Sequence, residues 1–200
     1  MALGRFIKRL SSWQDTDNPY LIVGLGNPEP RFSGTRHNAG FLAVDKMHQA
    51  NGGATWKSAH GALISRLKIK GKNVMLAKPQ KYMNNSGEVI KDLLDYYKIP
   101  LESLIVIYDD ADLDAGRLRI RKAGGPGTHN GMRSIVSYIG EDFARVRIGI
   151  GKPEKGDLAD YVLAKPEDMD EFNRVTAKAA DAVTEILESG IDKAMGAFNV

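Results

Sequence analysis

From residue 20 onward, short apolar runs alternate with longer stretches of helical periodicity, a pattern typical of an α/β domain. Strands are predicted where the apolar residues are continuous or alternate with polar ones, at 20–25, 61–69, 74–77, 104–109, 117–121 and 144–150. The second and third of these flank a Lys-Gly-Lys-Asn turn and are expected to form a hairpin.

Helices are predicted where apolar residues recur at spacings of three and four. The first covers about 38–50, with Asn38 as a possible cap, and the second starts after residue 85 or 86 and stops before Pro100. A third ends at Gly140, and the last begins near Pro166 with four acidic residues at its positive end. The first 18 residues show no sustained period, so we expect a basic tail at 1–18 and one domain at 19–200.

The composition is globular, with 42% hydrophobic and 26% charged residues among 200. The lack of Cys excludes disulfide scaffolds, thiol nucleophiles and thiolate zinc sites, and it fits a reducing cytoplasm. No apolar run approaches the roughly 18 residues of a membrane span. The predicted location is therefore the cytoplasm, without a membrane partner.

The formal charge of +3 is misleading as a total, because residues 1–14 hold three basic and no acidic side chains and account for all of it. Residues 117–152 hold eight basic and two acidic side chains, whereas residues 153–200 hold five basic and eleven acidic ones. Any electrostatic attraction to nucleic acid is therefore expected from the segment 117–152.

The first predicted strand runs into Gly24-Leu25-Gly26-Asn27, which begins like a dinucleotide-binding fingerprint. Glu29 occupies the position of the third glycine, so that fingerprint fails. The glycines are interpreted as a sharp turn that presents Asn27 at the edge of the sheet.

Four carboxylates follow the strand at 104–109, between Asp109 and Asp114. This segment does not match a calcium-binding loop, because Ala115 and Arg121 stand where such a loop needs Gly and Glu. Ligands usually bind at strand ends in α/β sheets, so one or two of these acids could orient a catalytic base while the others face water. A plain polar turn is the alternative.

Two histidines in predicted loops, His37 and His129, are candidates for a general base, since a neutral imidazole suits that role near pH 7. A carboxylate at a neighbouring strand end could fix the tautomer of such a base. Either histidine could instead cap a helix, and Asn84 and Asn85 could likewise cap a helix or recognise a peptide backbone.

Basic side chains recur at a spacing of two on both of the last predicted strands, at Arg117, Arg119 and Arg121 and again at Arg145 and Arg147. Guanidinium groups bind phosphate oxygens in pairs, so these stripes could form a phosphate-binding surface. An exposed face with salt bridges explains the spacing equally well.

Taken in order, these segments resemble the bacterial-type peptidyl-tRNA hydrolases from Tyr20 to about Gly190. The matching residues are Leu21 to Pro28, Thr35 to Gly40, Lys78-Pro79 with Tyr82-Met83-Asn84 and Ser86-Gly87, Asp109-Asp110 with Asp112-Leu113 and Gly116, Gly124-Gly125 with Gly127 and His129-Asn130-Gly131, and Arg145 with Arg147 to Gly151 and Pro153. The resemblance implies a catalytic domain at 19–200 with three layers, a central mixed sheet flanked by helices.

The same resemblance implies hydrolysis of the ester that joins a peptide to the 3′-terminal ribose of tRNA. His37 would be the general base that activates water, Asp109 would hold its basic tautomer, and Asn27 would position the substrate or the water. No metal or cofactor is expected, because an ester is already activated relative to an amide.

The implied substrate-binding side chains are Phe32, Tyr82 and Met83 lining the cleft, Asn84 and Asn130 on the peptide backbone and the tRNA end, and Arg121 and Arg147 on phosphate. The expected partner is tRNA, and the expected working form is a monomer with no obligate protein partner.

Three residues depart from the usual family pattern. Glu29 replaces a glycine, Phe32 replaces a tyrosine and loses a phenolic hydrogen bond, and Thr128 stands where a small residue is common before His129. Some organellar RNA splicing factors resemble this family and lack its activity, so a non-catalytic RNA-binding relative is the alternative. The intact His37, Asp109 and Asn27 argue against it.

Overall fold

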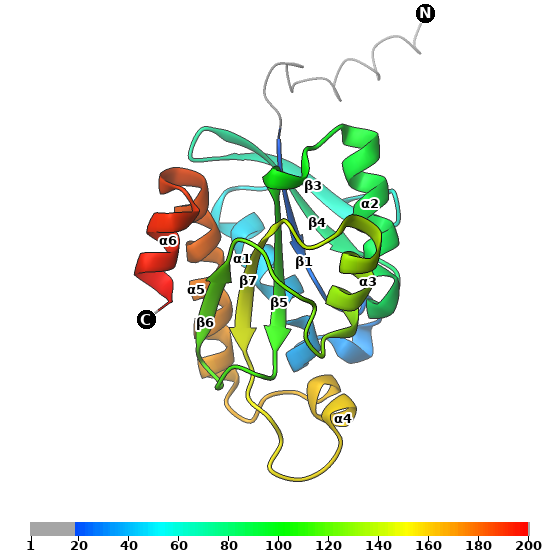
Figure 1. The fold of residues 1–200 in the computed structure, drawn as a ribbon, viewed down its shortest axis with the longest axis vertical. Coiled ribbons are helices and arrows are strands. Elements are labelled where there is room, and N and C mark those ends of the chain that lie inside the picture. The colour runs from blue at the N-terminus through cyan, green and yellow to red at the C-terminus, as the bar shows by residue number, and fades with distance from the viewer. Residues whose placement is uncertain (1–18, 200) are drawn as a thin grey trace, which may run out of the picture.

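The computed structural model describes residues 19–199, and its elements follow the predicted alternation (Figure 1). The strands are β1 (Tyr20–Gly24), β2 (Lys57–Ala59), β3 (Ala62–Ile69), β4 (Lys72–Pro79), β5 (Leu104–Asp110), β6 (Leu118–Arg121) and β7 (Ala144–Gly149). The α-helices are α1 (Ala39–Ala50), α2 (Ser86–Tyr97), α3 (Asn130–Ile139), α4 (Leu158–Leu163), α5 (Met169–Ser189) and α6 (Ile191–Phe198). The tail expected at 1–18 lies outside the described residues.

The strands form one mixed sheet in the order β2-β3-β4-β1-β5-β7-β6. Its centre is parallel, since β1 pairs with β4 and β5, and β5 pairs with β7. The pairs at both edges are antiparallel. Helices cover both faces of the parallel centre, which explains why Leu21, Ile22 and Val23 are all fully buried in one unbroken apolar run.

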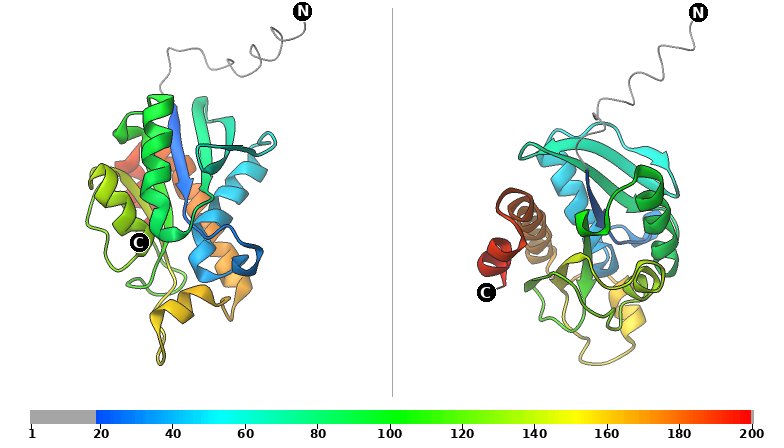
Figure 2. Two further views of the ribbon diagram at one scale, coloured as in Figure 1. Left: turned by 90° about the vertical axis from the view of Figure 1, so that its right-hand side faces the viewer. Right: turned by 45° about the horizontal axis from the view of Figure 1, so that its top comes forward.

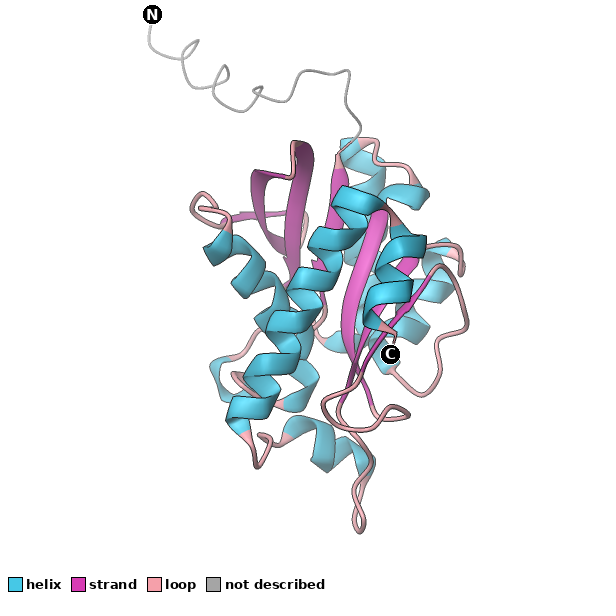
Figure 3. Cartoon of the chain, turned by 90° about the vertical axis from the view of Figure 1, so that its left-hand side faces the viewer, coloured by secondary structure: helices cyan, strands magenta, loops and turns pink. Residues whose placement is uncertain are grey.

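Two hydrophobic cores lie on opposite faces of the sheet. One joins the sheet to α1, α5 and α6, and the other joins it to α2 and α3. Figure 2 shows these two groups of helices on either side of the strands, and Figure 3 views the molecule from the side of α5 and α6. The three-layer α/β domain with a mixed central sheet is therefore confirmed.

The C-terminal third contains more helices than predicted. The helix expected from Pro166 begins at Met169, because the Asp168 side chain caps it by accepting from the Glu171 N–H at 2.8 Å. It ends at Gly190, whose φ of 89° breaks the helix before α6 begins. The six-residue α4 and the three-residue β2 were also missed, since neither is long enough to show a period.

The glycines that follow β1 do not form the sharp turn that was predicted, since neither Gly24 nor Gly26 has a positive φ. They instead allow α1 to approach the sheet. A Cβ on Gly24 would lie 2.1 Å from the carbonyl oxygen of Gly40 in α1, and one on Gly26 would lie 2.7 Å from the Phe41 ring. This close packing brings the start of α1 over the carboxyl ends of β1 and β5.

The last described residue closes one edge of the sheet. The Asn199 side chain accepts from the Ile120 N–H at 2.6 Å and donates to the Ile120 carbonyl at 3.1 Å. An amide thus takes the place of a neighbouring strand on β6, and Arg119 donates to the Asn199 carbonyl beside it.

Candidate active site

A pocket of about 740 Å³ opens where β1, β4 and β5 end, with β1 neighbouring both of the other strands. The strand order reverses here, and such a point is the usual ligand site of open α/β sheets. The predicted site residues all line it, namely Asn27, Phe32, His37, Tyr82, Met83, Asn84, Asp109, Arg121, Asn130 and Arg147. The topology therefore brings together residues from five separate segments of the chain, at 27–37, 82–84, 109, 121–130 and 147.

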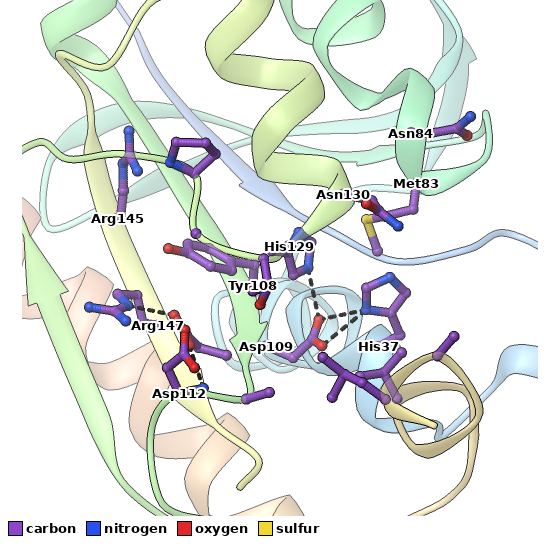
Figure 4. A pocket seen from close by; sticks show the side chains of 18 of the residues that line it. His37, Met83, Asn84, Tyr108, Asp109, Asp112, His129, Asn130, Arg145 and Arg147 are labelled. Carbon is purple, nitrogen blue, oxygen red and sulfur yellow. Dashed lines mark hydrogen bonds and ion pairs between the residues drawn. The ribbon is translucent and has the colours of Figure 1, made fainter. Parts of the chain in front are cut away.

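His37 and Asp109 form a buried pair at the centre of this pocket (Figure 4). The Nδ1 atom of His37 lies 3.1 Å from Oδ1 and 3.0 Å from Oδ2 of Asp109. His37 belongs to the 3₁₀ turn η4 (Arg36–Asn38) at the start of α1, and Asp109 lies at the end of β5. With the carboxylate at Nδ1, the imidazole carries its proton there and keeps Nε2 free to accept one.

His129 is the third member of this cluster, and of the two roles considered for it, general base or helix cap, it takes the cap and adds a contact with Asp109. It is the N-cap of α3, where its Nδ1 accepts from the Met132 N–H at 3.1 Å. Its Nε2 lies 3.1 Å from Oδ1 of Asp109. Because Nδ1 accepts, the proton must lie on Nε2, so His129 donates to the same carboxylate that His37 uses.

The charges and hydrogen bonds of the cluster shift the pKa values of His37 and Asp109 in opposite directions. Burial opposes the protonation of His37, but the charge of Asp109 and its hydrogen bond raise the His37 pKa above its ordinary 6.5. Burial also penalises the Asp109 carboxylate, yet the charges and hydrogen bonds of the two histidines bring its pKa far below the ordinary range. Asp109 therefore stays ionised wherever His37 can titrate.

The three side chains of the cluster place one potential metal-ligand atom each within 4.8 Å of one another. The proton positions explain this geometry without a metal. His129 uses Nδ1 to cap α3 and Nε2 to donate, so neither nitrogen is left as a ligand. The remaining two side chains are too few for a metal centre of their own.

Asn27 is held from three directions at the end of β1. Its Oδ1 accepts from the Met83 N–H at 3.0 Å, and its backbone N–H and C=O both bond the side chain of Asn38. The Asn38 side chain thus fixes the Asn27 backbone and does not cap α1 as predicted. Within the described residues the Asn27 amide nitrogen makes no hydrogen bond, and it is the group available to a ligand.

Two loops meet at the mouth of the pocket. The Tyr82 hydroxyl donates to the Glu29 carboxylate, which also pairs with Arg31 at 2.8 Å. Glu29 itself has φ −68° and ψ 141°, an ordinary extended conformation, so its departure from glycine costs the loop nothing. Tyr82 remains half-exposed beside Asn84, and both are accessible to a substrate.

The arginines predicted to form a uniform stripe have different environments. Arg121 is exposed at the pocket, whereas Arg147 donates to Asp110 at 2.6 Å and is only partly exposed. Arg145 is buried and donates to the carbonyls of Gly125 and Glu141, at 2.7 and 3.2 Å. The phosphate-binding alternative therefore does not extend to Arg145, which holds the glycine-rich loop in place.

The four carboxylates from Asp109 to Asp114 divide only in part as expected, because Asp110 pairs with an arginine and its side chain is only 12% exposed. Asp109 faces the histidines, Asp110 pairs with Arg147 and accepts from the Asp112 N–H, and Asp112 forms a salt bridge to Lys152 at 2.7 Å.

Sequence reasoning missed two other parts of the pocket wall, Tyr108 and helix α4. Tyr108 is buried inside an apolar strand, where burial raises its pKa to about 12, and it gave no signal of its own.

An imidazole held by a buried carboxylate in an open pocket has the chemistry of a hydrolytic site, since such an imidazole can act as a general base toward water. Residues 21–200 match the family described as peptidyl-tRNA hydrolase. A peptidyl-tRNA hydrolase of Thermoanaerobacter sp. (strain X514) is 49% identical over 183 residues, 90% of this chain and 99% of the relative. The chain therefore belongs to the peptidyl-tRNA hydrolase family.

Solved structures agree with this assignment. The peptidyl-tRNA hydrolase of Acinetobacter baumannii matches with a TM-score of 0.83 and 35% identity, over 94% of this chain and 97% of that one. A Campylobacter jejuni 5′-methylthioadenosine/S-adenosyl homocysteine nucleosidase matches with a TM-score of 0.52 and 10% identity, covering 85% and 98% of the two chains, and this shows a shared fold alone. In the described part of the chain, no helix has the length and apolar character needed to cross a membrane.

Proposed function

We propose that this chain hydrolyses the ester bond between a peptide and the 3′-terminal ribose of tRNA, with His37 as the general base. The buried His37–Asp109 pair at the centre of the pocket carries this proposal. Family membership supports the substrate class, since both relatives described above are peptidyl-tRNA hydrolases by name.

In the first step, His37 Nε2 accepts a proton from a water molecule while the oxygen of that water attacks the ester carbonyl carbon. The carbonyl π electrons move to oxygen and form a tetrahedral oxyanion. The Asp109 carboxylate stabilises the imidazolium formed in this step, because it lies 3.0 Å from the opposite nitrogen. The free amide N–H of Asn27 is positioned to hold the water or the developing oxyanion.

In the second step, the oxyanion collapses and the bond between the carbonyl carbon and the ribose oxygen breaks. His37 returns its proton from Nε2 to the leaving ribose oxygen, which yields a free peptide acid and a tRNA with an intact 3′ end. His129 takes no proton in either step, because it holds Asp109 in place with a proton that its cap fixes on Nε2.

The remaining pocket residues have separable roles in recognition. Asn84 and Asn130 offer amide groups to the peptide backbone and the tRNA end, beside Phe32, Tyr82 and Met83. Arg121 and Arg147 would hold phosphate, and Arg147 would exchange part of its contact with Asp110 for it. We further propose residues 19–200 as the catalytic unit, acting as a cytoplasmic monomer.

Replacement of His37 with Ala tests the mechanism. The variant should bind tRNA with unchanged affinity, and its kcat should fall by a factor of about 10² to 10⁴, the usual contribution of a general base. The substrate is an N-blocked aminoacyl-tRNA, with free aminoacyl-tRNA as the control. Near wild-type turnover by the variant would remove His37 from the mechanism, and a wild-type chain that binds tRNA without cleavage would favour the RNA-binding alternative.

A further inference from the structure

Helix α4 forms one wall of the pocket, and it packs against the domain only with partly buried side chains. Its pocket-facing side chains are Leu158, Ala159, Val162 and Leu163. None of its six residues is buried, and Leu163 is 39% exposed. Tyr161 and Val162 pack, partly buried, against the hydrophobic core. Because a six-residue helix is not stable by itself, the position of this wall also depends on polar contacts.

The main connection between α4 and the domain is the side chain of Arg36. Its Nη1 donates to the carbonyls of Tyr161, Ala164 and Lys165, at 3.2, 3.4 and 3.0 Å. Its guanidinium carbon also lies 3.9 Å from the centre of the Tyr161 ring. These carbonyls belong to the last turn of α4 and the residues after it, where a helix leaves acceptors unsatisfied and carries partial negative charge.

The backbone of Arg36 adds a fourth bond to the same segment, since its N–H donates to the Ala164 carbonyl at 3.1 Å. Arg36 is buried, and among the described residues no carboxylate pairs with it. A buried guanidinium is costly without hydrogen bonds, so its position depends on the carbonyls at the end of α4. The Tyr161 hydroxyl ties the helix to the end of β7 with a bond of 2.6 Å to the Ile150 carbonyl.

Arg36 and His37 are consecutive residues of one 3₁₀ turn. The side chain of His37 contacts Asp109 in the pocket, and the side chain of Arg36 contacts the carbonyls of α4. One turn therefore sets both the place of the base and the place of the wall, and in Figure 4 the α4 ribbon passes directly beside His37.

We propose that Arg36 is a positioning residue that fixes α4 as the wall of the substrate pocket at a set distance from the catalytic base. This inference rests on the proposed function. The apolar side chains of α4 would contact the substrate beside the scissile ester. Loss of Arg36 frees the wall and leaves the His37–Asp109 pair unchanged, because that pair makes no contact through α4.

The test is Arg36→Gln, with Arg174→Gln on the exposed face of α5 as the control for loss of one positive charge. For Arg36→Gln we expect KM for N-blocked aminoacyl-tRNA to rise about tenfold, as for the loss of one charged hydrogen bond, with kcat within about threefold of wild type. The pH at which kcat falls on the acidic side, where His37 becomes protonated, should be the same as in wild type. Arg36→Lys, which keeps the charge but not the planar fork, should recover part of the KM effect.

Hydrogen exchange provides a readout that needs no substrate. Amides of residues 158–164 should exchange faster in Arg36→Gln than in wild type, while those of α5 should not change. A fall in kcat with constant KM, a change in the pH at which kcat falls on the acidic side, or unchanged exchange at 158–164 would overturn the inference. If Arg36→Gln does not fold, the same measurements on Arg36→Lys decide.

The two proposals fail in different ways. A wild-type chain that does not cleave N-blocked aminoacyl-tRNA would contradict the proposed function, whatever Arg36 does. Cleavage by wild type with no change in exchange or KM on replacement of Arg36 would contradict only the positioning role.

Discussion

The Asp109 carboxylate accepts hydrogen bonds from His37 and His129. We expect Asp109→Asn to move the proton of His37 from Nδ1 to Nε2. The cap on α3 fixes the His129 proton on Nε2, which points at position 109. An amide has a single accepting oxygen, and it would turn toward this fixed donor. Its amino group would then face Nδ1 of His37, which can accept only when the His37 proton lies on Nε2. The atom that should take a proton from water would already carry one.

The expected cost is the whole contribution of the general base, a factor of about 10² to 10⁴ in kcat, or roughly 2.7 to 5.4 kcal/mol. The pH dependence should change as well. Wild-type activity should fall as the pH drops through the His37 pKa, which Asp109 raises above 6.5 against the opposing effect of burial. Without the carboxylate, burial acts alone and lowers that pKa, so the residual activity should extend to lower pH than in wild type.

The assay is kcat for N-blocked aminoacyl-tRNA against pH, with Asp114→Asn as the matched control, an exposed carboxylate of the same segment. A second variant isolates the tautomer argument. Adding His129→Ser to Asp109→Asn keeps a capping hydroxyl but removes the competing donor, so the amide oxygen can turn to His37 and kcat should rise. The reasoning is refuted if the single variant stays within threefold of wild type, or if the double variant is no faster than the single one.

Further outcomes are expected at the phosphate site, the sheet and the histidine cluster. Replacing both Arg121 and Arg147 with Gln should raise KM and reduce the slope of log KM against log salt by about 1 to 2, and an unchanged slope would argue against phosphate contacts. Gly24→Ala should lower the free energy of unfolding by about 1–3 kcal/mol, because its Cβ would meet the Gly40 carbonyl oxygen at 2.1 Å; Gly196→Ala, with nothing within 4 Å, is the control in thermal unfolding. Activity should be the same with and without a chelator, and a loss that added metal restores would contradict the proton assignment at His129.

The central strands could be predicted because burial on both faces leaves a continuous apolar run, as at 20–25 and 104–109. Short elements could not, since α4 has six residues and its position depends on hydrogen bonds from Arg36, 125 or more residues away in sequence. No local pattern records such a contact.

Within the site, the pairing of a loop histidine with a carboxylate at a neighbouring strand end was accessible from the residues themselves, and the family resemblance named His37 and Asp109 as the pair. The role of His129 was not accessible, because the sequence offered it as a general base or a helix cap, whereas the structure uses one nitrogen for the cap and the other for a bond to Asp109. The arginine stripe was wrong in part for a similar reason. Spacing places Arg145 and Arg147 on one strand face but cannot say that Phe143 and the glycine-rich loop cover the first of them.

The contact of Asn199 with Ile120 has a consequence for self-association. An open sheet edge offers a template on which a second chain can add a strand. On β6 the backbone groups of Ile120 are already bonded by an amide side chain, and the opposite edge, β2, is only three residues long. Both routes to a continuous sheet between two copies are therefore obstructed, one of them by the side chain of Asn199. Replacing Asn199 with Ala would leave the backbone groups of Ile120 on the β6 edge open to such pairing.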